Sequence, residues 1–580
     1  MSSAVYHIKK LAGEIGEYKK PAILTPIFVV LEVIMEILVP FLMAYLIDNG
    51  IDKGDMNTVI ILGAVLITCT LLSLLFGILA GKFSADASAG FAKNLRHSVF
   101  YNIQNFSFSN IDKFSTSSLI TRLTTDVTNV QNAFMMVIRI AIRAPVMMIL
   151  AFVMVLIING SLSIIFLCLL PLLALCMYLI ITKAHPIFER IFKTYDKLNK
   201  VVQENIRGIR VVKSFVRESY EKKKFNAVSK EIYKDFSKAE KLLALISPTM
   251  QFFMYLAMLL VSWFGANLIV SDLFTKGELI SVISYAMQIL MSLMMLAMVF
   301  VMITMARASA RRIVEVLDEE TELTNPENPV TTVKDGSVSF KDVSFSYSKD
   351  SMRCALENIN LEIKSGEMIG IIGGTGSSKT SLVQLIPRLY DVLSGSVSVG
   401  GVDVRDYDMK ALRDEVSVVL QKNVLFSGTI KENLRWGNAN ATDEEIVRVS
   451  KLAHADEFIQ TFPDKYDTKV EQGGTNVSGG QKQRLCIARA LLKKPKILIL
   501  DDSTSAVDTK TDADIRKSLR EEIPNTTKII IAQRISSIEG ADKIIVLDGG
   551  KISALGTHEE LLKASEIYRE VYTSQTRGAE

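Results

Sequence analysis

Cysteine is scarce in this sequence, and its net charge is small. The five cysteines among 580 residues are scattered, with no C-x-x-C pair and no histidine at a metal-site spacing. We therefore expect neither disulfides nor zinc, and we expect the three cysteines that lie in apolar segments to be small buried residues. A formal net charge of +4 gives no reason to propose a nucleic-acid partner.

The sequence also lacks the features of a cleavable signal peptide. Its N-terminal stretch from Tyr6 to Lys20 is basic and amphipathic, and it leads into an apolar run that is too long for the hydrophobic core of a signal. We therefore expect the first apolar run to stay in the protein.

Long apolar runs fill the first half of the chain. Six are long enough to cross a bilayer, which takes about 20 residues each. The predicted spans are about 21–46, 59–80, 138–158, 162–181, 243–270 and 279–305. The third span has to include Arg139 and Arg143, which we place either at the cytosolic boundary or facing the interior of the helix bundle.

The connections between the spans alternate in length. Two of them, 81–143 and 182–241, are long and rich in lysine and arginine, whereas the others are short. The positive-inside bias places the long connections and both termini in the cytosol. Their tips, near 110–118 and 212–220, are predicted either to contact a cytosolic motor or to be ordinary charged loops. A transmembrane domain over 1–318 follows from this reading.

Two features inside the predicted spans are candidates for cargo contact. Glu32 and Glu36 share one face of a helix, and they either attract organic cations or form a buried contact between helices. Methionines recur along the sixth span at spacings of 4, 3, 4, 4 and 3, which is one stripe that either lines an adaptable cavity or simply packs. The stripe includes Met287, Met291, Met294 and Met298, and continues to Met302 and Met305.

The second half reads as a separate α/β domain. A polar linker over 319–336 precedes a domain over 337–580 in which short apolar strands alternate with helices. A glycine-rich turn follows one strand and opens a helix, which is the arrangement of a phosphate cradle. Its residues are Gly373, Gly374, Thr375, Gly376, Ser377, Ser378, Lys379, Thr380 and Ser381. Lys379 would reach the outer phosphates and Thr380 would bind Mg²⁺.

Other motifs follow in a fixed order around this turn. Tyr347 ends an early strand and is a candidate to stack on an adenine, and Gln421 ends a later strand where its amide can orient water or Mg²⁺. The strand 497–501 is apolar and ends in a carboxylate, Asp501, that is suited to Mg²⁺. The remaining candidates are Ser478, Gly479, Gly480 and Gln481 before a helix, then Asp502, Ser505, Asp508 and Gln533.

In these motifs and their order the sequence resembles one half of an ATP-binding-cassette exporter. The resemblance implies an all-α six-helix transmembrane domain, domain-swapped with a partner and fused to an α/β P-loop domain with a helical subdomain at about 425–480. It implies ATP and Mg²⁺ as cofactors, Ser478–Gln481 as a signature that completes the partner's ATP site, and Ser505 and Asp508 as part of the D-loop. The two cytosolic tips would be coupling helices.

Three residues depart from the family pattern. The family has glutamate at position 502, histidine at 533 and glycine at 378, whereas this chain has Asp502, Gln533 and Ser378. The shorter carboxylate is withdrawn by roughly 1.5 Å, and a misplacement of about 1 Å can cost on the order of 100-fold in rate. We therefore predict a site that hydrolyses ATP poorly, against the alternative of a variant that hydrolyses normally.

The intact signature and the weakened site together predict one half of a heterodimer in a bacterial-type cytoplasmic membrane. The predicted function is ATP-driven export of small hydrophobic or amphipathic compounds, multidrug export above all. The alternatives are a homodimeric lipid or peptide exporter and a regulatory ATP-binding subunit. No peptidase-like domain precedes the first span, which counts against processed peptides as cargo.

Overall fold

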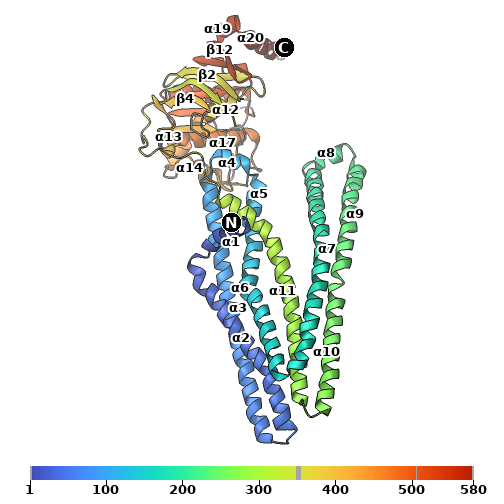
Figure 1. Ribbon diagram of the computed structural model, residues 1–580. Helices are drawn as coiled ribbons and strands as arrows, with labels where there is room; N and C mark the ends of the chain where they lie inside the picture. The colour runs from blue at the N-terminus through green and yellow to red at the C-terminus, as the bar shows by residue number, and fades with distance from the viewer. Residues whose placement is uncertain (1–2, 348–353, 504–505, 578–580) are drawn as a thin grey trace. The chain divides into compact units, whose positions relative to one another are not determined.

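The chain forms two units (Figure 1). The computed structural model describes residues 3–347, 354–503 and 506–577. The helical unit consists of Met1–Gln104 and Thr116–Glu319, and the α/β unit consists of Asn105–Ser115 and Glu320–Glu580. The short segment at 105–115 therefore leaves the helical unit and belongs to the α/β unit.

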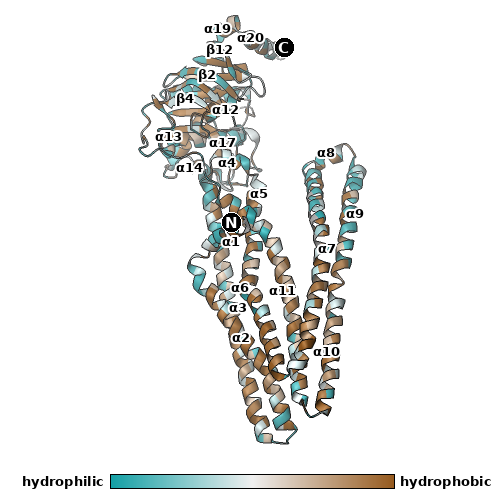
Figure 2. Cartoon of the chain, in the orientation of Figure 1, coloured by the Kyte–Doolittle hydropathy of each residue, from teal (hydrophilic) through white to brown (hydrophobic). Residues whose placement is uncertain are grey.

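Among the residues that the structure describes, the helical unit contains six stretches that are long and apolar enough to cross a membrane, and their lengths run from 36 to 53 residues. Figure 2 shows the apolar residues concentrated along these helices. The prediction of six spans is confirmed. Its elements are α1 (Ser3–Gly13), η1 (Gly16–Tyr18), α2 (Lys19–Leu46), η2 (Ile47–Ile51), α3 (Met56–Gln104), α5 (Thr116–Thr121), η3 (Arg122–Asp126), α6 (Val127–Ile158), α7 (Gly160–Arg207), α8 (Ile209–Ser214), α9 (Glu218–Leu243), α10 (Ile246–Val270) and α11 (Lys276–Leu317).

Local capping explains where the spans turn. Asn159 alone separates α6 from α7, and its side chain accepts hydrogen bonds from the backbone N–H groups of the next helix. Thr275 starts α11 in a capping box with Glu278, and its hydroxyl donates to Asp48 at 2.6 Å. A Cβ at Gly277 would lie 2.4 Å from the Ala44 carbonyl oxygen, so only glycine lets α11 approach α2 this closely.

The two glutamates of α2 face an arginine of α6. The Arg143 guanidinium lies 2.6 Å from a carboxylate oxygen of Glu32 and 2.7 Å from one of Glu36. Arg143 therefore faces the interior of the helix bundle, and both glutamates make the contact between helices that we gave as the alternative to cargo binding. Two carboxylates share one guanidinium, and Glu32 Oε2 has no hydrogen-bond partner among the described residues.

The methionine stripe of α11 lies on the exposed side of this protomer. Met287, Met291, Met294 and Met298 are 39–58% exposed, whereas Tyr285 and Val299 on the other side of the same helix are buried. Packing within this chain does not account for the stripe. A bilayer, a partner chain or a cargo cavity is left to cover it.

One expectation about the cysteines is wrong. Of the three in apolar helices, Cys69 is buried, Cys176 is partly buried and Cys168 is exposed. A helix that crosses a membrane presents apolar residues to lipid as well as to protein. An apolar sequence context therefore does not show that Cys168 is buried in the protein.

Three sheets build the α/β unit. The largest has the strand order β12-β11-β3-β10-β9-β6, in which all neighbours are parallel except β12 and β11. The others have the orders β2-β1-β4-β5 and β7-β8. The strands are β1 (Val338–Phe345), β2 (Leu356–Ile363), β3 (Met368–Gly373), β4 (Ser394–Val399), β5 (Val402–Asp403), β6 (Val416–Val419), β7 (Gly428–Thr429), β8 (Lys469–Val470), β9 (Ile497–Asp501), β10 (Thr527–Ile531), β11 (Lys543–Asp548) and β12 (Lys551–Gly556).

Helices surround these sheets. They are α4 (Phe108–Lys113), α12 (Lys379–Gln384), α13 (Met409–Glu415), α14 (Ile430–Arg435), α15 (Asp443–Leu452), α16 (Asp456–Ile459), η4 (Lys465–Asp467), α17 (Gly479–Leu492), α18 (Thr509–Glu522), η5 (Ile535–Ser537), α19 (His558–Ala564) and α20 (Glu566–Arg577). Helices α14 to α16 fall within the predicted helical subdomain at 425–480. Part of the predicted linker packs on this unit, where the Val330 backbone exchanges hydrogen bonds with Asp406 and Asp408.

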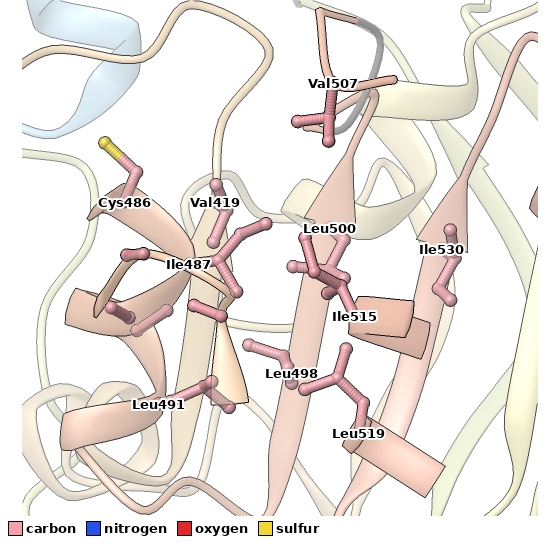
Figure 3. Close-up of a cluster of buried hydrophobic side chains, with 14 of the residues drawn as sticks. Val419, Cys486, Ile487, Leu491, Leu498, Leu500, Val507, Ile515, Leu519 and Ile530 are labelled. Carbon is pink, nitrogen blue, oxygen red and sulfur yellow. The ribbon is translucent and has the colours of Figure 1, made fainter. Parts of the chain in front are cut away.

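Each face of the large sheet carries its own apolar core. Leu498 and Leu500 of β9 belong to one cluster, and Ile497 and Ile499 belong to the other, because successive side chains of a strand point to opposite faces. Figure 3 shows the first cluster, in which Leu498 and Leu500 lie among side chains of α17 and α18. Because β11, β3, β10, β9 and β6 run parallel, their carboxyl ends meet at one edge of the sheet. Ligands of α/β domains bind at this edge.

We predict that Arg143→Met destabilises the folded chain, because it leaves Glu32 and Glu36 without a counter-charge. Removing one partner of a buried ion pair costs about 3–5 kcal/mol. Thermal unfolding in lipid should show a clear loss of stability. Arg139→Met, one turn earlier on α6, is the matched control, and an equal loss for both variants would contradict the prediction.

Candidate functional site

The predicted phosphate cradle is a turn between β3 and α12. The Lys379 ammonium lies inside it and donates hydrogen bonds to the carbonyl oxygens of Gly373 at 2.8 Å and Gly374 at 2.9 Å. Burial lowers the pKa of Lys379, and the nearby Asp501 and Asp502 oppose that shift. A Cβ at Gly373 would come within 2.2 Å of the Leu547 carbonyl oxygen, so glycine is needed where β3 meets β11.

Ser378 has a left-handed backbone. Its φ of 68° and that of Gly376, 85°, both lie in the region that disfavours side chains. The sequence shows only that a serine side chain replaces the glycine of the family, and the structure adds a cost in the backbone conformation. Serine here is strained by on the order of 1 kcal/mol relative to glycine.

Thr380 and Asp501 form a pair of oxygen donors at the end of β9. The Thr380 hydroxyl donates to Asp501 Oδ2 at 2.8 Å, and Asp501 is buried. Burial raises the pKa of Asp501, and the hydrogen bond from Thr380 opposes that rise. The described residues contain no cluster of three or more His, Cys, Asp or Glu for a metal. The pair fits Mg²⁺, which is commonly held by one or two protein oxygens together with phosphates and water.

Asp502 contacts both glutamines that the sequence analysis singled out, Gln421 and Gln533. Gln533 Nε2 donates to Asp502 Oδ2 at 2.6 Å, and Gln421 Nε2 lies 3.4 Å from the same oxygen. Burial raises the pKa of Asp502, and these two amides oppose the rise. The structure therefore brings together Gln421, Asp502 and Gln533, and it does so with one carboxylate oxygen already accepting hydrogen bonds.

Tyr347 lies beside the cradle. Its hydroxyl is 2.8 Å from Ser381 Oγ, and its ring meets the rings of Phe345 and Tyr390 edge-on. The side chain remains 53% exposed, so ring surface is available for a base to stack on.

The predicted signature opens α17 at the surface of this unit. Ser478 is its N-cap, in a capping box with Gln481, and both Ser478 and Gly479 are exposed. A Cβ at Gly480 would lie 2.8 Å from the Ala506 carbonyl oxygen, so the segment before α18 packs directly on the signature. Asp508 caps α18, and Ser505 lies outside the described residues.

The sequence did not predict how the first tip, near 110–118, is held. Helix α4 contacts Tyr390, whose hydroxyl donates to Asp112 Oδ2 at 2.7 Å and whose ring lies 6.0 Å from that of Phe108. Burial, followed by Asp112, raises the pKa of Tyr390. Because Tyr390 also touches Tyr347, a line of contacts joins α4 to the cradle. A lone tyrosine before a turn gave no signal for this.

Comparison with known proteins agrees with this architecture. The chain matches the family model of the ABC transporter transmembrane region over 22–294 and that of the ABC transporter over 356–505. It is 39% identical over 528 residues to YfiB, an uncharacterized ABC transporter ATP-binding protein of Bacillus subtilis (strain 168), and the match covers 91% of each chain. This chain belongs to the ABC transporter family.

Further similarities refine the placement among ABC transporters. An ATP-dependent lipid A-core flippase of Desulfotalea psychrophila is 34% identical, with 83% of this chain and 84% of that protein covered. The probable multidrug resistance ABC transporter protein YheI of Bacillus subtilis is 36% identical, with 70% and 69% covered. The structure of a bacterial Atm1-family ABC exporter with ATP bound superposes with a TM-score of 0.82 at 25% identity, covering 96% and 98%.

These findings confirm several expectations. The chain is an ABC half-transporter of the exporter type, with a six-helix membrane domain fused to an ATP-binding α/β unit. ABC exporters are ATP-hydrolysing membrane proteins that work as dimers. The roles of the individual site residues, Mg²⁺ and the identity of the partner remain predictions.

We predict that Ser378→Gly stabilises the chain by about 1 kcal/mol, because glycine adopts the left-handed backbone without strain. Thermal unfolding of the full-length protein should shift upward. Thr375→Gly is the matched control, since Thr375 is exposed and its backbone is not left-handed, so glycine there gains nothing. No rise for Ser378→Gly relative to Thr375→Gly would contradict the prediction.

Proposed function

We propose that this chain is one half of a heterodimeric ABC exporter and that its own ATP site hydrolyses slowly. The observation that carries the proposal is the hydrogen bond from Gln533 to Asp502 at 2.6 Å. The residue expected to polarise the attacking water is Asp502. Its side chain is shorter than glutamate, and its carboxylate already accepts a hydrogen bond from the Gln533 amide. Gln533 can donate a hydrogen bond but cannot become cationic.

The residues present fit ATP and Mg²⁺. Lys379 and the turn of the cradle would hold the phosphates, the Thr380–Asp501 pair would hold Mg²⁺, and Tyr347 would stack on the adenine. Bound Mg²⁺ would supply charge neutralisation between the phosphates. Asp502 would then orient water weakly, because Gln533 and Gln421 compete for the same carboxylate oxygen.

The signature serves the other half of the transporter. Ser478 and Gly479 are exposed at the start of a helix of 14 residues, and the N-terminus of a helix favours an anion. In the proposed dimer this segment completes the ATP site of a partner that carries glutamate and histidine at the positions of Asp502 and Gln533. Hydrolysis would then occur mainly at the partner's site.

The second tip supports a domain-swapped partner. Around α8, Val211, Phe215 and Val216 are 59–79% exposed, which is unusual for apolar side chains at a cytosolic tip. On the α/β unit, a groove of about 320 Å³ has a wall formed by Phe426 and Trp436, stacked at 4.1 Å. We propose that each chain's α8 tip enters the corresponding groove of the other chain, while α4 and Tyr390 form the coupling contact within this chain.

We propose that cargo contacts the exposed methionine stripe of α11 and the two carboxylates, Glu32 and Glu36, beside Arg143. Adaptable methionines suit varied hydrophobic compounds, and the two carboxylates with one guanidinium suit those that carry positive charge. Two of the similar proteins carry the names of a lipid flippase and a probable multidrug transporter, and both names favour amphipathic cargo. We propose a bacterial-type cytoplasmic membrane with the α/β unit in the cytosol, an orientation that the positive-inside bias supports.

Two other functions remain as alternatives. A homodimeric lipid or peptide exporter would have two weakened sites, and a regulatory subunit would bind ATP without contributing to transport. The test is to change the exposed methionines to alanine. If transport is lost while ATP hydrolysis stays intact, the regulatory subunit is excluded.

The decisive experiment compares ATP hydrolysis by this chain alone in lipid with hydrolysis by the same preparation plus a partner half-transporter. We expect a near-zero rate alone and a large rate together, because only the partner's site has a full set of hydrolytic residues. A robust rate from this chain alone would replace the heterodimer with a homodimer.

We predict that Asp502→Glu combined with Gln533→His raises hydrolysis at this chain's site by at least about tenfold, because it restores carboxylate reach and a cationic partner for the γ-phosphate. Single-turnover hydrolysis should be measured with the partner's site inactivated. Asp502→Gln with Gln533→His is the matched control, which has the same length without the charge. No difference between the two double variants would mean that Asp502 is not the defect.

A further inference from the structure

The loop that carries Gln533 is held from the C-terminal helix. Gln575 of α20 donates from Nε2 to the Gln533 carbonyl oxygen at 2.8 Å and accepts at Oε1 from the Ile535 N–H at 2.9 Å. One side-chain amide therefore satisfies two backbone groups on either side of Arg534. The contact joins positions that are 40 and 42 residues apart in the sequence.

Helix α20 is a fixed support for this amide. Tyr568 is fully buried, its hydroxyl lies 2.7 Å from His558 Nδ1, and burial raises its pKa to about 12. Val571 and Tyr572 pack against the core on the same face of the sheet. The apolar contacts hold the helix in place without Gln575, so a change at Gln575 should leave α20 docked.

The other side of the loop is held by α18. Arg516 donates to the Ser536 carbonyl oxygen at 2.9 Å, and the Ser537 hydroxyl donates to Asp512 Oδ2 at 2.8 Å. These bonds fix the end of the loop at η5. At its beginning, the Ala532 N–H donates to the Ile371 carbonyl oxygen at 3.1 Å, and Gln575 then holds the next residues, where the Gln533 side chain turns toward Asp502.

We propose that Gln575 is a positioning residue for the ATP site, which holds the backbone of 533–535 so that the Gln533 amide stays on Asp502. The role of Gln533 itself rests on the proposed function, whereas the hold on the loop does not. The C-terminal helix is thereby a working part of the nucleotide site. It acts through Gln533, because the hydrogen bonds of the Gln575 side chain go to the loop backbone at Gln533 and Ile535.

Hydrogen exchange on the full-length chain in lipid tests the hold directly. With Gln575→Ala we expect the Ile535 amide to exchange about ten times faster, because it loses its acceptor. Residues 566–572 should keep their protection. Gln575→Glu retains the acceptor and should protect Ile535 while losing the bond to the Gln533 carbonyl. Ser574→Ala, at an exposed neighbouring position, is the matched control.

Two results would overturn the proposal. Unchanged exchange at Ile535 in Gln575→Ala would show that the amide does not hold the loop. Faster exchange all along α20 would show that Gln575 anchors the helix instead. Neither readout depends on how fast this chain hydrolyses ATP, so failure of the proposed function would be seen separately in the rates with and without a partner.

Retention of radiolabelled ATP tests whether Gln575 acts through Gln533. We expect Gln575→Ala and Gln533→Ala to change the dwell time of ATP by the same factor, and the double variant to go no further. Effects that multiply would mean that the two residues act independently, and the positioning role would be wrong. Gln575→Glu should fall between the wild-type chain and Gln575→Ala.

Discussion

A bilayer offers its interior segments no hydrogen-bond partners, so a chain that crosses it must satisfy its own backbone. This chain does so with six helical stretches of 36 to 53 residues, whereas about 20 residues are enough to span the hydrocarbon core. The excess length becomes arms beyond the membrane. Helices α4 and α8 are the short helices at which these arms turn, between α3 and α5 and between α7 and α9.

The large sheet of the α/β unit imposes a second constraint. Parallel strands bring Gly373, Asp501 and the end of β10 to one edge, so the groups proposed to bind phosphate, Mg²⁺ and water are neighbours although they are far apart in the sequence. A substitution at this edge therefore also affects the neighbouring side chains. Asp502 and Gln533, two of the three departures from the family pattern, form one hydrogen-bonded group with Gln421 rather than two separate changes.

Much of the fold and the position of the site follow from the sequence because their signals are local. Apolar runs of sufficient length predict spans, and a glycine-rich turn between strand and helix predicts a phosphate cradle. The order of the motifs then identifies the family. These features need only neighbouring residues, and the structure agrees with them.

The partners of individual side chains do not follow from the sequence, because they depend on distant contacts. Arg143 and Glu36 are 107 positions apart, and the pattern of one span alone leaves the arginine at the boundary or in the interior. The left-handed backbone of Ser378 follows from where β3 and α12 place the turn. Gln575 lies in a polar helix where nothing marks it from its neighbours.

The assignment of α4 to the α/β unit matters for how the protein can be taken apart. A fragment that begins at Glu320 follows the obvious boundary in the sequence, yet it omits 105–115 and with it the bond between Tyr390 and Asp112. In such a fragment the aromatic group beside the cradle, Phe345, Tyr347 and Tyr390, loses its cover from Phe108. A separately produced α/β unit therefore keeps these contacts only when residues 105–115 are supplied with it, as a fused or added peptide.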